Sequence, residues 1–315
     1  MRAIDLFCGT GAFTTAMKDL GIEVVFATDI KPESKTMYND NHPGERFHCG
    51  DINDLDVKDI PQHDLLTAGF PCVSFSSLGN RQGFKDPRAR TIDKVVEIAR
   101  HHLPAMIVIE NVRNLLSHDN GTAYAHIRQQ FEALGYTVKS VVLDTAKHSV
   151  LPHHRERLYI TCLLSSGAAA LLDMDYPKVE PRYFRDYLEP TVPEKYYYSD
   201  RYKCFPLLEK TIVREDRLYQ MRHFKGGYVR ELKILPTFTG GFGTGGHQVP
   251  LFLDKGRIRK FMPRELYALQ GFPSTHIIDG HSDTRLNVLI GNSVSIPIVR
   301  QVIQHGIEAI EKSRT

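Results

Sequence analysis

The sequence predicts an α/β fold, a doubly wound and mostly parallel sheet with a second, smaller domain, and three observations point to it. Short apolar runs alternate with amphipathic segments through the first half of the 315 residues. Polar or glycine-rich loops follow several of these runs, as they do at the carboxyl ends of parallel strands. With 42% apolar residues, the chain is long enough to bury one large domain and one smaller domain.

Each element of the first half has its own pattern. Strands are expected where short apolar runs end in turns, at residues 1–7, 23–30, 64–70, 105–112 and 136–144. Helices are expected where apolar residues recur with a helical period, at residues 14–21, 91–103 and 123–135, the first of them stopped by Gly21. The alternation argues for βα units, so a ligand is expected at the carboxyl edge of the sheet.

The composition argues against several classes of protein. Five cysteines are spread along the chain without a close pair, so neither a disulfide framework nor a zinc site is expected, and we assign no metal. They are Cys8, Cys49, Cys72, Cys162 and Cys204. The N-terminal residues do not resemble a secretory leader, and no apolar run of about 18 residues occurs. We therefore expect a cytoplasmic protein with reduced thiols and no membrane segment.

Basic residues gather in one part of the chain, although the net charge is only +3. Residues 181–260 contain 16 lysines and arginines against 9 acidic residues, together with eight of the fourteen tyrosines. Lysine and arginine replace counterions on phosphates while aromatic rings pack on sugars or bases, so this composition favours binding to a polyanion. An ordinary solvated region with partly buried tyrosines stays open as the alternative.

The loops after the first strands suit a nucleoside. Gly9 and Gly11 let the backbone turn tightly and approach a ligand, although this G-x-G spacing alone is a weak signal. Asp29 lies about twenty residues further on, where a carboxylate can accept both hydroxyls of a ribose. Asp51 is a third polar candidate, and Ile52 beside it could pack on an adenine. Because no phosphate-binding lysine accompanies them, these residues indicate a nucleoside cofactor without a phosphate chain.

Three further loops carry reactive side chains. Cys72 stands in GFPCVSFSS after an apolar run, and the composition leaves a buried core thiol and a nucleophile as its two readings. Glu110 ends the strand MIVIENV, where a carboxyl group is costly unless it is solvated, paired or used to handle a proton. Arg155 and Arg157 would share one side of an extended segment and could grip a phosphate or a carbonyl oxygen, although surface salt bridges are their default role.

Six motifs occur in a fixed order: DLFCGTGAF, GFPCVSFS, ENV, HHRER, RELYALQGFP and GNSV. In this order and at comparable separations, they resemble the conserved blocks of the bacterial and phage cytosine-5 DNA methyltransferases. The resemblance covers the chain except for about residues 181–235. It implies a class I methyltransferase fold with a smaller, mainly β target-recognition domain. It also implies S-adenosylmethionine as cofactor, S-adenosylhomocysteine as product and double-stranded DNA as substrate.

The resemblance gives the reacting groups their roles. Carbon 5 of cytosine is not nucleophilic enough to take a methyl group unaided, so a thiolate must first add to carbon 6, and Cys72 is implied for this task. Glu110 of ENV is implied as the carboxyl group that meets ring nitrogen 3. Arg157 is expected to hold the carbonyl oxygen of the base, with Arg155 nearer the backbone.

The resemblance also implies which residues bind the cofactor. The turn after the first strand would face the methionine part, the two acidic loops the ribose and the adenine, and GNSV would close the site. The implied set is Phe7, Gly9, Thr10, Gly11, Asp29, Ile30, Asp51, Ile52, Pro71, Asn292 and Ser293.

DNA contacts are implied in two regions. The family flips its cytosine out of the duplex and closes the serine-rich loop over it, and that loop supplies Ser76, Arg81, Lys85 and Arg88. Residues 217–250 occupy the target-recognition region, where arginines can pair with guanine and glycines allow a close approach to the duplex. The candidates there are Arg217, Arg222, Arg230, Thr237 and Phe238, the last two in the place of a threonine-leucine pair of the family.

The domain prediction follows from the same resemblance. Residues 1–178 and 282–315 are predicted to form the catalytic domain that binds S-adenosylmethionine, and residues 179–281 the small target-recognition domain. A C-terminal helix at about residues 294–312 is expected to return to the first domain, and one catalytic unit per chain suggests a monomer.

The chain departs from the family pattern at three positions. Val73 stands where the family usually has a glutamine after the cysteine, and His153 stands where it has another glutamine, at the start of HHRER. Thr91 aligns with a leucine that normally lines the cofactor site. These departures bear on the affinity for cofactor and DNA and on the geometry of the loop, while the reacting groups are intact.

Two other functions stay open at this point. A relative of the family methylates cytosine in transfer RNA, although this chain lacks the cysteine-phenylalanine-threonine motif of that branch. A non-catalytic DNA-binding regulator could keep the same fold, although the retained Cys72 and Glu110 speak against it. A companion restriction endonuclease that forms no stable complex with the chain also stays open.

Overall fold

The computed structural model describes residues 1–70, 90–222, 227–241 and 250–315. Contacts between Cα atoms divide the chain into two compact units. The first unit consists of Met1–Asp144, Glu156–Lys178 and Val294–Thr315, and the second of Thr145–Arg155 and Val179–Ser293. This division places residues 145–155 and 282–293 in the second unit, whereas the predicted catalytic domain includes them. The functional assignment of the domains stays a prediction, because compactness does not say which unit performs which task.

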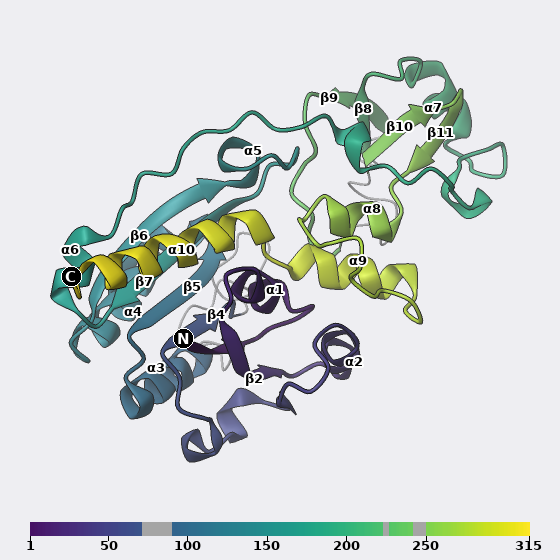
Figure 1. Ribbon diagram of the computed structural model, residues 1–315. Helices are drawn as coiled ribbons and strands as arrows, with labels where there is room; N and C mark the ends of the chain where they lie inside the picture. Colours follow the sequence, from purple (N-terminus) through teal and green to yellow (C-terminus); the bar gives the residue numbers. More distant parts are fainter. Residues whose placement is uncertain (71–89, 223–226, 242–249) are drawn as a thin grey trace. The chain divides into compact units, whose positions relative to one another are not determined.

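A seven-stranded sheet forms the centre of the first unit (Figure 1). Its strands are β1 (Arg2–Leu6), β2 (Glu23–Asp29), β3 (Phe47–Cys49), β4 (Leu65–Ala68), β5 (Met106–Val112), β6 (Thr137–Asp144) and β7 (Glu156–Leu163). They lie in the order β3-β2-β1-β4-β5-β7-β6, and β1 to β5 pair in parallel. β7 runs antiparallel to both β5 and β6. The predicted doubly wound, mostly parallel sheet is confirmed.

Helices cover both faces of this sheet (Figure 1). They are α1 (Ala12–Asp19), α2 (Pro32–Asn41), α3 (Arg90–His102), α4 (Thr122–Glu132), α6 (Ser166–Leu171) and α10 (Ile296–Lys312). Helix α10 contacts α1, α6, β5 and β7, while α3 and α4 contact each other. The predicted C-terminal helix is therefore present and packs within the first unit.

The pleat of β5 separates the two faces. Ile107 and Ile109 belong to an apolar core that also contains residues of α3 and α4. Met106 points the other way, and a Cβ placed on Gly306 of α10 would overlap its sulfur atom. Only glycine lets α10 lie this close to the strand. Because side chains alternate along a strand, Glu110 emerges on the α10 face, near the carboxyl end of β5.

The second unit contains a four-stranded antiparallel sheet of order β11-β10-β8-β9. Its strands are β8 (Leu218–Arg222), β9 (Tyr228–Leu232), β10 (Pro250–Asp254) and β11 (Arg257–Lys260). Its helices are α5 (Thr145–His148), α7 (Phe205–Thr211), α8 (Pro263–Ala268) and α9 (Asp283–Asn292). One face of the sheet forms an apolar core with Leu208 and Ile212 at the end of α7. The antiparallel sheet agrees with the expected mainly β character of this part of the chain.

One stretch of the described chain, Asp283–Lys312, is apolar and long enough to be considered as a membrane span. It comprises α9 and α10, which are separated by residues 293–295. Because 67% of its most apolar window is buried inside the protein, as in the core helices of soluble proteins, this is weak support for a span.

Candidate active site

The turn after β1 is shaped by three left-handed residues. Phe7, Gly9 and Gly11 have φ angles of 60°, 54° and 79°. Gly11 caps the start of α1, and a Cβ there would lie 2.6 Å from the imidazole Nε2 of His42. A Cβ on Gly9 would meet nothing within 4 Å. The turn is therefore tightly packed behind Gly11 and open in front of Gly9, as a cradle for a ligand must be.

Asp29 joins this turn to the end of β2. One of its carboxylate oxygens accepts a hydrogen bond from the backbone N–H of Gly9 at 3.0 Å, and the other accepts one from that of Lys31 at 2.9 Å. The side chain of the next residue, Ile30, is 61% exposed, which is unusual for a large apolar residue. The structure thus brings Gly9, Asp29 and Ile30 together at the carboxyl edge of the sheet.

Asp51 and Ile52 follow β3 and have local partners. The Asp51 carboxylate accepts hydrogen bonds from the backbone N–H of Asn53 at 2.9 Å and from its side-chain amide at 2.8 Å, which caps a short 3-10 helix. Ile52 is 5% exposed and packs in the main apolar core. Of the two isoleucines predicted at the cofactor site, Ile30 is the one whose side chain faces solvent.

A buried carboxyl group lies behind the turn, and the sequence analysis missed it. Asp5 is fully buried in β1 and accepts hydrogen bonds from the backbone N–H and the hydroxyl of Thr14 and from the hydroxyl of Thr67. Burial raises the pKa of Asp5 from 3.8 to about 7, although these hydrogen bonds oppose the rise. The signal in the sequence was an aspartate inside the apolar run RAIDLF. Asp5 fixes the first turn of α1 against β1 and β4.

Glu110 and Arg157 form an ion pair on one face of the sheet. The guanidinium Nε of Arg157 lies 2.9 Å from Oε1 of Glu110, with side chains 15% and 10% exposed. In the antiparallel register, Arg157 faces Val112 and Tyr159 faces Glu110, so the two charged residues are diagonal neighbours on adjacent strands. A second guanidinium nitrogen of Arg157 donates to the carbonyl of Glu156 at 2.8 Å. The pairing of β5 with β7 therefore places a carboxyl group and a guanidinium side by side.

The loop after β4 is held next to this pair. The side-chain amide of Asn111 donates to the carbonyl of Phe70 at 3.3 Å. A Cβ placed on Gly69 would lie 3.8 Å from Oε2 of Glu110. The carboxyl group is therefore close to the backbone at the start of GFPC, three residues before Cys72.

Several predicted residues lie outside the described part of the chain. These are Pro71, Cys72, Val73, Ser76, Arg81, Lys85 and Arg88, and the side chain of Arg222 is not described either. Thr91 is the first residue of α3 whose side chain is described, and it is buried.

Arg155 has different partners from Arg157. It precedes β7 and belongs to the second unit, where its side chain is buried. Its guanidinium donates to the carbonyls of Phe238 at 2.9 Å, Gly291 at 3.3 Å and Ser293. Arg155 and Arg157 therefore have separate partners, backbone carbonyls for Arg155 and Glu110 for Arg157, and their shared side of an extended segment stays a prediction.

Asn292 and Ser293 lie at the end of α9 in the second unit. The carbonyl of Ser293 accepts hydrogen bonds from Arg155 and from the side-chain amide of Gln270. The side chain of Asn292 approaches Gly240, where a Cβ would lie 2.9 Å from its Oδ1. A glycine at 240 thus lets the chain pass close to the end of α9.

Two of the predicted DNA-reading arginines are paired within the second unit. Arg217 lies 3.1 Å from Glu231 and 3.6 Å from Asp216. Arg230 donates through two nitrogens to the side-chain oxygen of Gln220, its cross-strand neighbour, at 3.1 and 2.7 Å. Arg217 directly precedes β8 and Arg230 lies in β9, and each would have to exchange a protein partner for a base.

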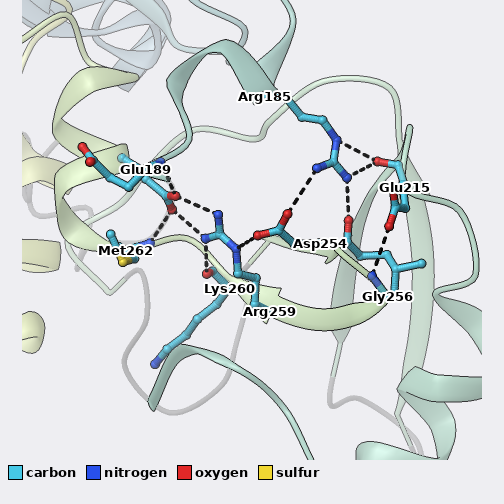
Figure 2. A network of polar contacts seen from close by, with 10 residues as sticks. Arg185, Glu189, Glu215, Asp254, Gly256, Arg259, Lys260 and Met262 are labelled. Carbon is cyan, nitrogen blue, oxygen red and sulfur yellow. Dashed lines mark hydrogen bonds and ion pairs between the residues drawn. The ribbon is translucent and has the colours of Figure 1, made fainter. Parts of the chain in front are cut away.

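A buried ionic network, which the sequence analysis did not anticipate, supports the same unit (Figure 2). Arg259 and Glu265 are both 0% exposed and are joined by two hydrogen bonds of 2.9 and 2.8 Å. Arg259 also donates to Asp254 at 2.6 Å, and Glu265 accepts from the backbone N–H groups of Glu189 and Met262. The network fixes the β10–β11 hairpin to the start of α8.

Comparisons with known proteins agree with this arrangement. A model of the C-5 cytosine-specific DNA methylase family matches residues 1–308. The chain is 31% identical to the type II methyltransferase M.Bsp6I of Bacillus sp. (strain RFL6), over 97% of this chain and 98% of that protein. It is 33% identical to the type II methyltransferase M.HaeII of Haemophilus aegyptius, over 96% and 91%. The Dnmt2 methyltransferase of S. pombe has a similar fold, with a TM-score of 0.75, 21% identity, and 98% and 99% of the two chains covered.

Proposed function

Because the chain belongs to the C-5 cytosine-specific DNA methylases, we propose that it methylates a flipped cytosine in a specific double-stranded DNA sequence, through a covalent adduct of Cys72. It is a DNA cytosine-5 methyltransferase of the restriction-modification type. The observation that supports the detailed mechanism best is the Glu110–Arg157 pair beside the loop that leads to Cys72.

The reaction requires a nucleophile, a proton donor and a group that holds the base. The Cys72 thiolate adds to carbon 6 of cytosine, and the electron pair of the 5,6 double bond is displaced toward ring nitrogen 3. Glu110 gives a proton to that nitrogen, and Arg157 hydrogen-bonds the carbonyl oxygen. Carbon 5 would then take the methyl group that S-adenosylmethionine supplies, with S-adenosylhomocysteine as the other product. Loss of the carbon 5 proton to a base expels the Cys72 thiolate as the bond to carbon 6 breaks, and the proton on ring nitrogen 3 returns to Glu110.

Two of the four described thiols, those of Cys8 and Cys162, are poor candidates for the nucleophile. Burial raises the pKa of the Cys8 and Cys162 thiols well above the usual value, which disfavours the reactive thiolate. Both lie among apolar residues of the first unit. Among the remaining cysteines, the motif and the position after β4 favour Cys72.

The turn after β1 fits S-adenosylmethionine, which supplies the activated methyl group. Residues 7–11 contain no lysine or arginine, as expected for a nucleoside without phosphates. The open space in front of Gly9 can admit a ligand, Asp29 can accept the ribose hydroxyls, and the exposed Ile30 offers an apolar surface to a base. The turn of Phe7, Gly9, Thr10 and Gly11 would orient the methionine part, and Asn292 and Ser293 are proposed to close the site.

The partners follow from this chemistry. Double-stranded DNA is the substrate, and the basic residues of the second unit would contact its phosphates. We expect the protein to act as a monomer in the cytoplasm, where it meets chromosomal or phage DNA. A companion restriction endonuclease would recognise the same sequence without a stable complex.

Bisulfite sequencing of DNA from cells that express the protein tests this proposal. We expect one short sequence to carry 5-methylcytosine throughout the genome, and none of it in cells that express Cys72→Ser. Transfer of labelled methyl groups into duplex DNA and into transfer RNA should be compared in parallel. Labelling of transfer RNA alone would favour the alternative substrate, and cofactor binding without any labelling would favour a non-catalytic regulator.

A further inference from the structure

Two segments of the second unit are joined by main-chain and side-chain hydrogen bonds. They are residues 152–155, which lead into β7, and residues 235–238 of the predicted target-recognition region. The N–H of His154 donates to the carbonyl of Leu235 at 2.8 Å, and the N–H of Leu235 donates to the carbonyl of Pro152 at 3.1 Å. The hydroxyl of Thr237 donates to the carbonyl of His154 at 2.7 Å. Arg155 completes the junction through its hydrogen bond to the carbonyl of Phe238.

A ring stack lies at the centre of this junction. The imidazole of His153 packs on the ring of Phe238, with centroids 4.8 Å apart and planes inclined by 23°. Both side chains are 0% exposed. Two flat rings in this arrangement hold both backbones in a defined register, because either ring can move only if the other does.

By the resemblance to the family, each stacked residue stands in the place of another residue type. His153 occupies the place of a glutamine and Phe238 that of the leucine in the threonine-leucine pair. A glutamine against Phe238 would bring an amide into a buried apolar contact, which is costly unless the amide finds hydrogen-bond partners. A leucine against His153 would leave the face of the imidazole poorly packed. Each departure is thus easier to accommodate when the other is present.

We propose that the His153–Phe238 stack is a positioning contact that sets the target-recognition segment relative to the segment that carries His154 and Arg155 and leads into β7. It fixes Thr237, the neighbour of Phe238, through the carbonyl of His154. It also fixes the chain four residues before Arg157. This inference rests on the proposed function, and it assigns Phe238, which was expected to contact DNA, to a buried contact with His153 instead.

A double-mutant cycle tests the pair. The variants are His153→Gln, Phe238→Leu and their combination, which restores the residue types of the family. The readouts are the single-turnover rate of methyl transfer with saturating DNA and S-adenosylmethionine, the KM for S-adenosylmethionine, and the midpoint of thermal unfolding. His305→Gln is the matched control, because His305 stacks on Tyr176 in the first unit, with centroids 4.6 Å apart.

Each single variant is expected to lower the single-turnover rate by about 2- to 12-fold, which is the range for an aromatic pair worth about 0.5 to 1.5 kcal/mol. The double variant should recover most of that loss, and the KM for S-adenosylmethionine should not change. His305→Gln should leave the rate unchanged even where it lowers the unfolding midpoint. Should Phe238→Leu fail to fold, Phe238→Met replaces it in the cycle, because methionine adapts to irregular space.

The inference would be overturned if the fold-loss in rate of the double variant equalled the product of the two single losses. It would also be overturned if the rate fell in proportion to the unfolding midpoint in every variant, including His305→Gln. A wild-type protein that methylates no DNA would instead overturn the proposed function, and this inference with it. An active wild type with independent effects of the two variants would overturn the inference alone.

Discussion

At the residue scale, the proposed methyl transfer depends on a carboxyl group and a guanidinium that are far apart in the sequence. Glu110 and Arg157 come from strands that run in opposite directions, and their diagonal positions bring Nε and Oε1 to 2.9 Å. Both side chains are largely buried, so each would be costly to leave without the other. The pair can therefore present two fixed polar groups to one edge of a pyrimidine.

Glu110→Gln should lower the rate of methyl transfer by about 100- to 10,000-fold, the usual value of proton donation by a positioned side chain. The amide keeps the size of the carboxyl group but cannot give up a proton at neutral pH. Single-turnover methylation of a cognate duplex measures the effect. Glu132→Gln is the control, because Glu132 forms an exposed surface pair with Arg128. Unchanged turnover in Glu110→Gln would remove this residue from the mechanism.

Asp5 should make the stability of the protein depend on pH. Its folded-state pKa of about 7 lies above the unfolded value of 3.8, so the folded state binds the proton more tightly. The stability that this carboxyl group contributes is present in full below pH 3.8 and is lost as the pH rises to about 7. The contribution should fall by about 1.4 kcal/mol per pH unit within that window.

Asp5→Asn should flatten this dependence while keeping the fold, because the hydroxyl of Thr67 can donate to the carbonyl of Ile4 and accept from the new amide. Urea unfolding of both proteins at several values between pH 4 and pH 7 measures the difference. Equal slopes for the two proteins would mean that Asp5 is ionised in the folded state throughout.

At the element scale, β1, β2, β4, β5 and β6 were predicted from their patterns, whereas β3, β7 and α2 were not. The apolar runs that became β1, β2, β4, β5 and β6 end in recognisable turns. β3 has only three residues, which is too few for an alternating pattern. Helix α2 buries only Ser34, Met37 and Tyr38, so its sequence has little helical periodicity. Its position is set by packing against β2 and β3, which no local pattern contains.

The site was predictable in its residue types and not in its contacts. The motifs indicated Glu110 and Arg157, but their contact depends on the reversed direction of β7. Nothing in the sequence indicated that the Arg155 guanidinium binds carbonyls at the end of α9, because these partners lie more than a hundred residues further along the chain. The burial of Asp5 was not predicted, because a single acidic residue in an apolar run forms no recognisable pattern.

The end of α9 is the element whose packing is most easily tested. A Cβ on Gly291 would overlap the backbone carbonyl group of Thr239. A backbone group cannot move aside as the end of a flexible side chain can. Gly291→Ala should therefore destabilise the second unit by about 1 to 3 kcal/mol, as overpacking typically does.

Gly167→Ala in α6 is the matched control, because its Cβ would make only ordinary contacts with Ser165 and Ser313. Alanine favours the helix there by up to about 1 kcal/mol, so this variant should be neutral or stabilised. Urea unfolding of both variants measures the two effects. A Gly291→Ala protein as stable as the wild type would show that the contact at Thr239 adapts freely.

At the scale of the whole molecule, the basic residues are unevenly distributed between the two units. Residues 181–260 carry the excess of basic residues and form much of the second unit, while the net charge is only +3. Buried ion pairs of Arg259 with Asp254 and Glu265 stabilise that unit in addition to its apolar core. In the proposed function, exposed basic residues of this unit would contact phosphates, and one or more of Arg217, Arg222 and Arg230 would contact bases.

At least one of Arg217, Arg222 and Arg230 should behave as a base reader. Replacing such an arginine by alanine should cost about 1 to 3 kcal/mol on the cognate site and relax the preference at one position, whereas loss of a phosphate contact should weaken all sites alike. Methylation of duplexes with randomised flanking bases separates the two outcomes. If all three variants kept the wild-type preference at every position, base recognition would have to lie elsewhere in the chain.

The central claim, a covalent adduct between Cys72 and the target cytosine, is tested most directly by trapping. Duplexes with 5-fluorocytosine at the target should form a stable complex with the wild-type protein in the presence of S-adenosylmethionine, because fluorine cannot leave as a proton does. Mass spectrometry of the digested complex should place the nucleotide on Cys72. Cys72→Ser should bind DNA and form no adduct, because a hydroxyl is a far weaker nucleophile at neutral pH. A complex trapped equally by Cys72→Ser, or an adduct on another residue, would contradict the account.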